Sequence, residues 1–429
     1  MPSDWPTPFF GLSPMPLSEL VSYASRQHSQ KGEDFYATKV TGEHGVMGVF
    51  DSHGGKEAGS LCAAELVEQL TLLPAAANEC GHFAFPEDAV VDTFWAMDHR
   101  LGREGIYSGS TASVLLVSQT GNDEAPGLAC TIAWVGDSTA VAVSMADPCR
   151  SPPPLWQTAN HTPANAEESK RCVVEWEVRR EVQMLREAQR EETCGTNLVQ
   201  LEVGDPLSSD WSDSFVILKE PERESFYARK RAPTAVEVAA AVNASGLNVT
   251  EEDKALLVRA LGREKRIEAP ERRASFALGR ESTRSNTKVI ARGNADFGPK
   301  VLAGGDSGKV STCVTRSIGD WDGARAMIPQ PEISRFAVGP EEHVRVVIAS
   351  DGVWDFLSPD EAAGLARRAS TVNVAACAIA DKARARSMQR LNALKDDTTC
   401  LVVDLNPSRR AVLPPEPVAS GIGGCCAIA

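Results

Sequence analysis

Short apolar runs rich in β-branched residues recur along the chain, each bounded by Gly, Asp or Asn, and they constrain the fold more than any other feature. Runs of this kind predict β-strands. They lie at residues 45–50, 111–117, 129–135, 344–348 and 399–405. Segments rich in Ala and Leu with helical spacing lie between them, at residues 56–70, 88–101, 359–369 and 372–386. The sequence therefore predicts a fold in which strands and helices occur in mixed order.

The composition is that of a folded protein, because 42% of the 429 residues are hydrophobic and 24% are charged. The net charge of −14 argues against a nucleic acid partner but suits carboxylates that hold divalent cations. The 11 Cys form no CxxC pair and no leader of secretory type is seen, so we expect a reducing, intracellular compartment. Because no run of roughly 18 apolar residues occurs, we expect no membrane span.

Changes in composition divide the chain into four parts. Residues 1–20 are predicted to be an irregular N-terminal lead, and residues 21–163 together with 301–405 to form one catalytic domain. Residues 164–300 are basic towards their end and poor in strand signals, so they are predicted to be a helical, partly disordered insertion. Residues 406–429, rich in Pro and Gly, are predicted to be a flexible tail.

Three of the predicted strands lead into an aspartate, at Asp51, Asp137 and Asp351, and the pair Asp396 and Asp397 directly precedes a fourth. One Asp-Gly pair after a strand is usually only a turn. Four such sites are harder to explain in that way. Carboxylates that converge on one spot repel each other unless cations neutralise them, and hard oxygen ligands suit Mg²⁺ or Mn²⁺.

Seven short blocks, in this order, give the chain a family resemblance. They are Glu33-Asp34, Asp51-Ser52-His53-Gly54-Gly55, Gly109-Ser110-Thr111-Ala112, Val135-Gly136-Asp137-Ser138, Thr315-Arg316-Ser317-Ile318-Gly319-Asp320, Ala349-Ser350-Asp351-Gly352-Val353-Trp354-Asp355 and Asp396-Asp397-Thr398-Thr399. Together they strongly resemble the metal-dependent serine/threonine protein phosphatases of type 2C. The resemblance implies an α+β fold, namely a four-layer α-β-β-α sandwich of two antiparallel sheets flanked by helices. It also implies a centre of two Mn²⁺ or Mg²⁺ ions at one edge.

Ligand roles follow from the resemblance by position. Asp51 is implied to bridge both ions, and the backbone carbonyl of Ser52 is implied to bind one of them. Asp351 and Asp396 are implied to bind the other ion. Asp397 stands where the family usually has Asn, so the ligand is assigned to Asp396.

Further positions are implied to complete or support the site. Glu33 is implied to reach its ion through water, and Asp137 is implied to join Asp351 at a third, weaker metal site. Asp34 and Asp320 are implied to support the site without ligating.

The implied activity is that of a hydrolase that removes phosphate from phosphoserine and phosphothreonine in signalling proteins. Two ions that share a solvent molecule lower its pKa from about 15.7 towards about 7, so hydroxide attacks phosphorus in line and no protein nucleophile is needed. The seryl or threonyl oxygen leaves poorly as an alkoxide. His53 is therefore the candidate general acid, worth roughly 10² to 10⁴ in rate.

Two alternatives remain at this point. Ser29 stands where the family commonly has a phosphate-gripping Arg, and Arg26 and Lys31 are nearby candidates for phosphate binding. If neither replaces that Arg, the chain is a catalytically impaired, phosphatase-like binding protein. In a third interpretation the insertion is the functional centre, as a docking module for acidic partners or lipid headgroups.

The sequence also carries two modification signals. The terminal Cys426-Ala427-Ile428-Ala429 matches a prenylation box, and the adjacent Cys425 is a candidate for palmitoylation. We therefore expect a cytoplasmic monomer that binds phosphorylated proteins and is held at a membrane by lipid. Ser275 follows Arg272-Arg273-Ala274 and is a candidate phosphorylation site for basic-directed kinases.

Overall fold

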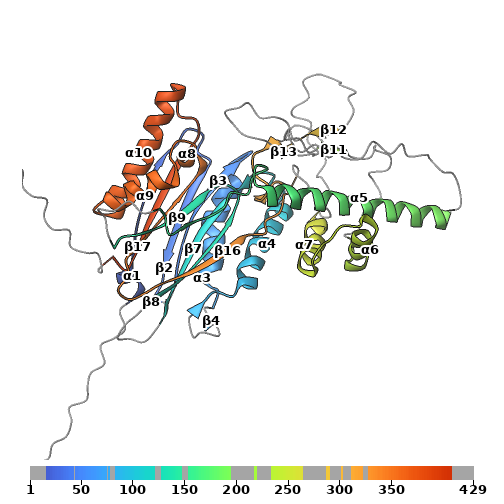
Figure 1. Ribbon diagram of the computed structural model, residues 1–429, viewed down its shortest axis with the longest axis horizontal. Coiled ribbons are helices and arrows are strands. Elements are labelled where there is room, and N and C mark those ends of the chain that lie inside the picture. The colour runs from blue at the N-terminus through green and yellow to red at the C-terminus, as the bar shows by residue number, and fades with distance from the viewer. Residues whose placement is uncertain are drawn as a thin grey trace, which may run out of the picture.

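The computed structural model describes residues 16–42, 44–74, 76–77, 83–120, 127–146, 153–194, 217–219, 233–263, 287–289, 301–302, 311–321 and 327–407. Within these ranges two antiparallel sheets pack face to face, and helices cover the outer face of each (Figure 1). The predicted four-layer α-β-β-α sandwich is confirmed. None of the described helices is both long and apolar enough to cross a membrane.

The first sheet has five strands in the order β1-β18-β17-β9-β10, and every neighbouring pair is antiparallel. Its members are β1 (Val21–His28), β18 (Thr398–Leu405), β17 (Val344–Ala349), β9 (Thr139–Ser144) and β10 (Trp156–Gln157). The central strands β17 and β18 are buried along their whole length, as expected of continuous apolar runs.

The second sheet has seven strands in the order β15-β6-β3-β7-β8-β16, with β2 also paired to β3. Its members are β15 (Ile318–Gly319), β6 (Gly109–Ser110), β3 (His44–His53), β7 (Ala112–Thr120), β8 (Gly127–Val135), β16 (Glu332–Val338) and β2 (Asp34–Val40). The predicted strands at 45–50, 111–117 and 129–135 correspond to β3, β7 and β8.

Side chains from the facing surfaces of the two sheets form the main core. Met47, Leu115 and Ile132 of one sheet pack with Ile348 and Leu401 of the other, and all five are fully buried. Burial of this kind stabilises by roughly 1.5 to 3 kcal/mol for each large apolar side chain. The sandwich is therefore a firm support for whatever its edges carry.

Two groups of helices cover the outer faces. The seven-stranded sheet is covered by α2 (Glu57–Leu61), the π-helical turn η1 (Cys62–Leu66), α3 (Val67–Thr71) and α4 (Glu87–Glu104). The five-stranded sheet is covered by α8 (Asp351–Trp354), α9 (Pro359–Arg368) and α10 (Val372–Leu391). Ser358 is the N-cap of helix α9, and its hydroxyl accepts the Glu361 N–H in a capping box.

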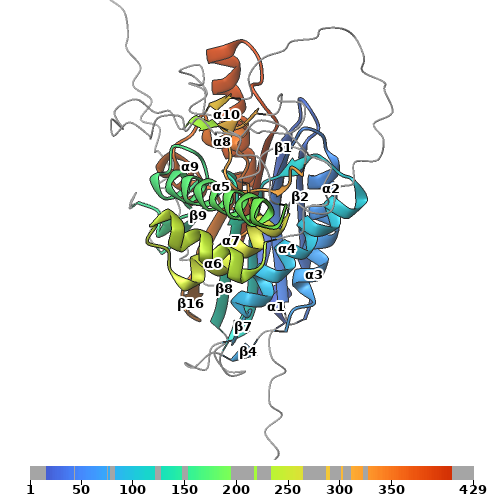
Figure 2. The ribbon, with the colours of Figure 1, turned by 90° about the vertical axis from the view of Figure 1, so that its right-hand side faces the viewer.

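Three further helices, α5 (Ala166–Cys194), α6 (Ala235–Ser245) and α7 (Glu251–Gly262), fall in the predicted insertion. We call them the three-helix unit. They pack on each other through a small core of their own, which includes Val178, Val242 and Leu261. Figures 1 and 2 both show α7 lying beside α4 of the sandwich. The short elements that remain are α1 (Leu17–Leu20), β4 (Ala76–Ala77), β5 (Phe83–Ala84), β11 (Ile217–Lys219), β12 (Thr287–Val289), β13 (Val301–Leu302) and β14 (Ser311–Thr312).

The strand registers bring the acidic turns to one edge of the sandwich. Ala349, the last residue of β17, pairs with β18 and β9 near the start of each strand. The turns that carry Asp351, Asp137 and Asp396 therefore lie at the same end of the five-stranded sheet. In the other sheet Asp34 at the start of β2 pairs with Asp51 near the end of β3.

A hydrogen bond joins the two sheets at this edge. The Ser350 hydroxyl, just after β17, lies 2.7 Å from Asp34 Oδ2 on β2. Ser350 Oγ also accepts the Thr399 N–H of β18 at 3.1 Å. These two bonds hold the acidic turns of one sheet next to those of the other. We call this end of the sandwich the acidic edge.

Candidate active site

Asp51 is the centre of the acidic edge. Its pKa is raised well above the ordinary value, first by loss of hydration and then by the negative charges of four other carboxylates. In order of effect these are Asp34, Asp351, Asp137 and Asp396. Groups that repel Asp51 in this way come from four separate parts of the sequence and from both sheets. The strand registers thus bring the predicted aspartates to the same edge of the sandwich.

Asp351 lies in the same electrostatic environment. Loss of hydration and the charges of Asp137, Asp355 and Asp396 raise its pKa well above the ordinary value. Its Oδ1 atom is shielded from solvent and has no hydrogen-bond partner. The same physical cause, burial first, raises the pKa of Asp137 to about 6 and that of Asp34 to about 6. An unpartnered, buried carboxylate oxygen among like charges is suited to a cation.

The neighbours Asp396 and Asp397 have different surroundings. Asp397 is 1% exposed and accepts four backbone N–H groups from the loop before β2, two on each carboxylate oxygen. These bonds outweigh its burial and lower its pKa. Asp396 is more exposed, and its Oδ2 accepts Lys31 Nζ at 2.7 Å. Asp397 thus fixes the loop, whereas Asp396 and Lys31 face the acidic edge.

The predicted residues Glu33 and Ser52 lie beside this loop. The Glu33 N–H is held by Asp397 Oδ2 at 2.6 Å, and its carbonyl accepts the Ser52 N–H at 3.1 Å. Ser52 does not adopt a positive φ, since only Asp320, Asn392 and Asn406 do so among the described non-glycine residues. Its hydroxyl is used inside the protein, where it accepts the N–H of Gly59 at 2.8 Å.

His53 forms a pair with Asp320 next to the acidic edge. Its Nε2 atom lies 2.7 Å from Asp320 Oδ2, and the imidazole is 31% exposed whereas Asp320 is 5% exposed. Burial lowers the pKa of His53, but the charge and hydrogen bond of Asp320 outweigh it and the pKa is raised. Gly109 makes the approach possible, because a Cβ there would collide with the Asp320 carboxylate. His53 is thus a partly exposed imidazole held by a buried carboxylate.

Arg26, predicted to bind phosphate, lies in another environment. Its Nε atom is 3.3 Å from Asp381 on α10, and the same carboxylate oxygen is 2.6 Å from His28 Nε2. Both side chains line an open hollow of about 500 Å³ beside Ser29 and Arg384. Lys31 is therefore the predicted phosphate-binding residue that the structure places at the acidic edge.

The predicted modification sites cannot be compared with the structure. Ser275, Cys425 and Cys426 lie outside the described residues, so phosphorylation and lipidation stay predictions.

Within the described ranges, no three His, Cys, Asp or Glu side chains already form a group that could hold a metal ion. The acidic edge is a set of mutually repelling carboxylates and not a closed cage. Sequence reasoning missed Lys395, which pairs with Asp355 beside this edge, because no pattern marked it.

A model of the family described as protein phosphatase 2C matches residues 23–175 and 302–391, together more than half of the chain. Probable protein phosphatase 2C 5 of Arabidopsis thaliana is 34% identical over 143 residues, which are 32% of this chain and 32% of that protein. Probable protein phosphatase 2C 33 of Oryza sativa subsp. japonica is 39% identical over 104 residues, 24% of this chain and 22% of that protein. The match thus spans about a third or less of the length of these relatives.

Solved structures are also similar. The crystal structure of serine-threonine phosphatase 2C from Toxoplasma gondii superposes with a TM-score of 0.48 at 14% identity, covering 90% of this chain and 94% of that chain. A serine/threonine phosphatase of Mycobacterium tuberculosis gives a TM-score of 0.40 at 12% identity, covering 90% of this chain and 99% of that chain.

Proposed function

Because the chain belongs to the protein phosphatase 2C family, we propose that it hydrolyses phosphoserine and phosphothreonine in proteins with the help of Mn²⁺ or Mg²⁺. The observation that carries this proposal is the acidic edge, where burial, followed by the charges of Asp34, Asp351, Asp137 and Asp396, raises the pKa of Asp51. Carboxylates held this close together are costly in a fold unless they serve a cation.

The donor set supports two ions. Asp51, on which the charges of carboxylates from both sheets act, is proposed to serve both ions, and the Ser52 carbonyl to serve one of them. Asp351, whose Oδ1 is buried and unpartnered, and Asp396 are proposed to hold the other side. Glu33 is proposed to act through water. When bound, the ions would supply hydroxide at neutral pH and neutralise charge on the phosphoryl group.

A third, weaker site is proposed at Asp137. Its pKa, raised to about 6 by burial, indicates a carboxyl that is poorly hydrated where it stands. The charge of Asp137 also acts on Asp351, so one ion between them would relieve both.

The proposed proton donor is His53. A seryl or threonyl alkoxide is a strong base and leaves slowly unless it is protonated. Asp320, 2.7 Å from Nε2, holds the imidazole in place and favours its protonated form. The imidazole is therefore oriented before the substrate arrives, with about a third of its side chain exposed.

Lys31 is proposed to meet the substrate phosphate. Its ammonium already pairs with Asp396, and its pKa is raised because the charges around it outweigh its burial. A phosphate that approaches the edge would compete for the same ammonium. Lys is a point charge and lacks the bidentate fork of Arg, so we expect weak ground-state binding of substrate. The family match does not favour the alternative of a binding protein without turnover.

The test is hydrolysis of a phosphothreonine peptide by the full chain, with Mn²⁺ or with excess chelator. We expect turnover that requires the metal, and a loss of at least about 100-fold in kcat for Asp51→Asn. Asp381→Asn is the matched control, because this carboxylate binds Arg26 and His28 away from the edge. Turnover that persists in chelator, or that Asp51→Asn leaves intact, would overturn the proposal.

A further inference from the structure

Asp320 is held in a backbone conformation that it would not adopt without support. Its φ is +56°, in the left-handed region that non-glycine residues rarely occupy, and Gly319 before it has φ +103°. Its own N–H makes only a long hydrogen bond, 3.4 Å, to the Ser108 carbonyl. The position of its carboxylate, and so of the His53 imidazole, depends on the contacts that hold residues 315–320. We call each set of these contacts a grip.

One grip comes from the end of α7. Arg263 donates two hydrogen bonds to the carboxylate of Asp98 on α4, at 2.8 and 3.0 Å, and also bonds the carbonyl of Gly319. Asp98 Oδ1 in turn accepts the Gly319 N–H at 2.9 Å. Arg263 and Asp98 therefore bind the peptide groups on both sides of Gly319, and one of those groups is the amide that leads into Asp320.

The packing around this ion pair is closed. The guanidinium lies 4.8 Å from the centre of the Trp321 ring, and Trp321 Nε1 donates to the Asp98 carbonyl at 2.8 Å. Arg263 is 8% exposed and Asp98 is fully buried. A buried ion pair with this many hydrogen bonds has one geometry, so it transmits the position of α7 to the segment that carries Asp320.

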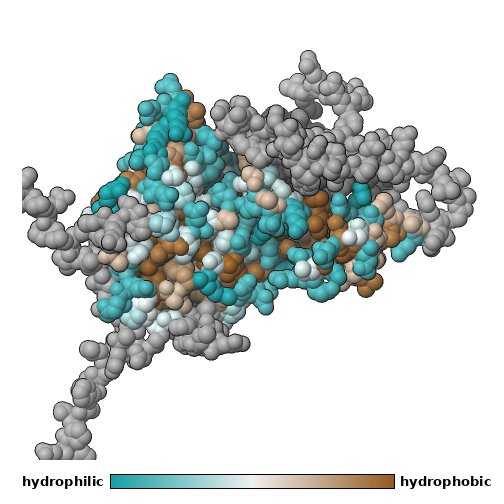
Figure 3. Space-filling model, viewed as in Figure 1, coloured by the Kyte–Doolittle hydropathy of each residue, from teal (hydrophilic) through white to brown (hydrophobic). Residues whose placement is uncertain are grey.

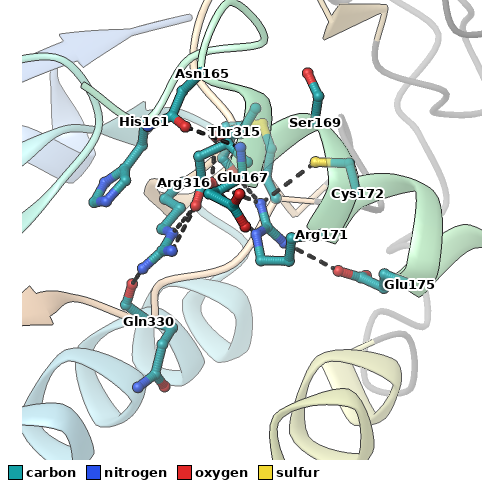
Figure 4. A network of polar contacts seen from close by, with 12 residues as sticks. His161, Asn165, Glu167, Ser169, Arg171, Cys172, Glu175, Thr315, Arg316 and Gln330 are labelled. Atoms are coloured by element: carbon teal, nitrogen blue, oxygen red, sulfur yellow. Dashed lines mark hydrogen bonds and ion pairs between the residues drawn. The ribbon is translucent and has the colours of Figure 1, made fainter. Parts of the chain in front are cut away.

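A second grip comes from the first turn of α5. Glu168, 3% exposed, accepts Thr315 Oγ at 2.6 Å and Arg316 Nε at 3.0 Å. Arg171, one turn later on the same helix, donates to the Thr315 carbonyl at 2.8 Å. Figure 4 shows Arg171, Thr315 and Arg316 gathered at this contact. Residues 315–320 are thus held at one end by α5 and at the other by α7.

Both grips belong to the three-helix unit, which has its own core and packs at the surface of the sandwich. Figure 3 shows hydrophilic and hydrophobic residues side by side over the unit. Val236 of α6 is 78% exposed. The unit is accessible from outside and is linked to the site through buried ion pairs. Its placement can therefore affect chemistry at His53 without any of its residues touching substrate.

We propose that Arg263 is a positioning residue through which the three-helix unit sets proton donation to the leaving group: it fixes the Gly319 peptide, and thereby Asp320 and His53. This inference rests on the proposed phosphatase function and adds to it. The step concerned is transfer of the imidazolium proton to the departing seryl or threonyl oxygen as the P–O bond breaks, which leaves neutral imidazole and an alcohol.

Two substrates separate positioning from general damage. The alkoxide leaving from a phosphothreonine peptide needs the proton, whereas the nitrophenolate leaving from p-nitrophenyl phosphate is a weak base and does not. For Arg263→Met in the full chain with Mn²⁺, we expect kcat on the peptide to fall roughly 10- to 100-fold with KM little changed. On the aryl phosphate we expect a change of less than about 3-fold. Arg263→Lys is expected to recover part of the peptide rate.

Arg259→Met is the matched control. Arg259 lies one turn earlier on α7, pairs with Asp92 at 2.9 Å and lies 4.8 Å from the centre of the Trp95 ring, so it repeats the Arg263 arrangement away from residues 315–320. We expect it to leave both substrates unaffected. In a His53→Ala background, Arg263→Met is expected to have no further effect on the peptide, because the donor it positions is gone.

The outcomes are distinct. Equal losses on both substrates, an unchanged peptide rate, or additive losses with His53→Ala would overturn the positioning role. If circular dichroism shows that Arg263→Met does not fold, Arg263→Lys is assayed on the same two substrates. A loss confined to the peptide then supports the positioning role, and equal losses on both substrates overturn it. If the unaltered chain hydrolyses neither substrate with Mn²⁺, the proposed function itself is wrong and this inference falls with it.

Discussion

At the scale of single residues, adjacent aspartates have separate tasks. Asp397 is buried and bonded to four backbone N–H groups, while Asp396 faces the acidic edge with Lys31. The sequence marked both as candidates, and only the departure from the family's usual Asn at 397 separated them. The bonds that explain Asp397 run to residues more than 360 positions earlier, so no local pattern could have predicted them.

We therefore expect opposite effects from two neighbouring substitutions. Asp397→Ala leaves several loop N–H groups without acceptors and should lower the free energy of unfolding by about 2 to 3 kcal/mol. Asp396→Ala should cost less than about 1 kcal/mol, since its bonds are more exposed, but should abolish Mn²⁺-dependent turnover. Urea unfolding and phosphopeptide hydrolysis on both variants check this. A stable, inactive Asp397→Ala protein would contradict the division of tasks.

Gly109 is needed for the close approach of Asp320. A Cβ at residue 109 would collide with the Asp320 carboxylate, so Gly109→Ala should push that carboxylate away from His53. We expect a loss of about 1 to 3 kcal/mol in stability and a larger fall in rate for the phosphopeptide than for p-nitrophenyl phosphate. Gly42→Ala is the control, because nothing lies within 4 Å of the added Cβ. Equal rates for wild type and Gly109→Ala would refute the crowding argument.

At the scale of elements, the strands that the sequence predicted are largely buried, although the buried strand β9 was not among them. β8 and β18 are buried at every position and read as continuous apolar runs. β1 and β16 were missed because they lie at sheet edges with mostly half-exposed side chains and polar residues. The predicted helix at 56–70 forms as α2, η1 and α3, and the π-helical turn has no sequence signal that we recognise. The domain boundaries stay predictions.

The site could be predicted as a location but not as a set of contacts. Strand-end aspartates show which turns meet, because the antiparallel registers place those turns at one edge. Arg263 and Glu168 carried no signal, since their partners lie in segments distant in sequence and their residue types are common on exposed helices. The roles predicted for the ligands and for His53 await the experiments above.

The ion pairs of Glu168, at the start of α5, are expected to make the stability of the fold depend on pH in acid. Burial alone would raise the pKa of Glu168, but Arg171 and Arg316 lower it to about 2 from the ordinary 4.5. A carboxylate whose folded pKa is depressed stabilises fully above the unfolded value and loses that contribution as pH falls from about 4.5 to about 2. The shift corresponds to about 3 kcal/mol.

Glu168→Gln should therefore destabilise the chain at pH 7 by on the order of 3 kcal/mol and flatten the pH dependence of unfolding below about 4.5. Denaturant melts between pH 7 and pH 3 measure both effects. Glu167→Gln is the control, since Glu167 is the exposed neighbour on the same turn. If the two variants show the same pH dependence of unfolding, the ion pairs of Glu168 do not stabilise the contact between α5 and residues 315–316.

At the scale of the whole molecule, the acidic edge opposes folding unless its charge is neutralised. Asp51 and Asp351 both carry raised pKa values caused by lost hydration and mutual repulsion. We expect Mn²⁺ to raise the melting temperature, because at 100 times Kd a ligand adds about 2.7 kcal/mol to stability. Asp351→Asn should reduce this metal-dependent gain and Asp381→Asn should not. A melting temperature indifferent to Mn²⁺ would argue against ions at this edge.

The hydrogen bond between Ser350 and Asp34 crosses from one sheet to the other at the place where the acids meet. A slip of one sheet relative to the other would separate these acids, since Asp34 and Asp51 belong to one sheet and the turns with Asp351 and Asp396 belong to the other. Catalytic geometry is thus tied to the register of the entire sandwich. Substitutions in the apolar layer that leave the protein folded but let the sheets shear should alter turnover from a distance.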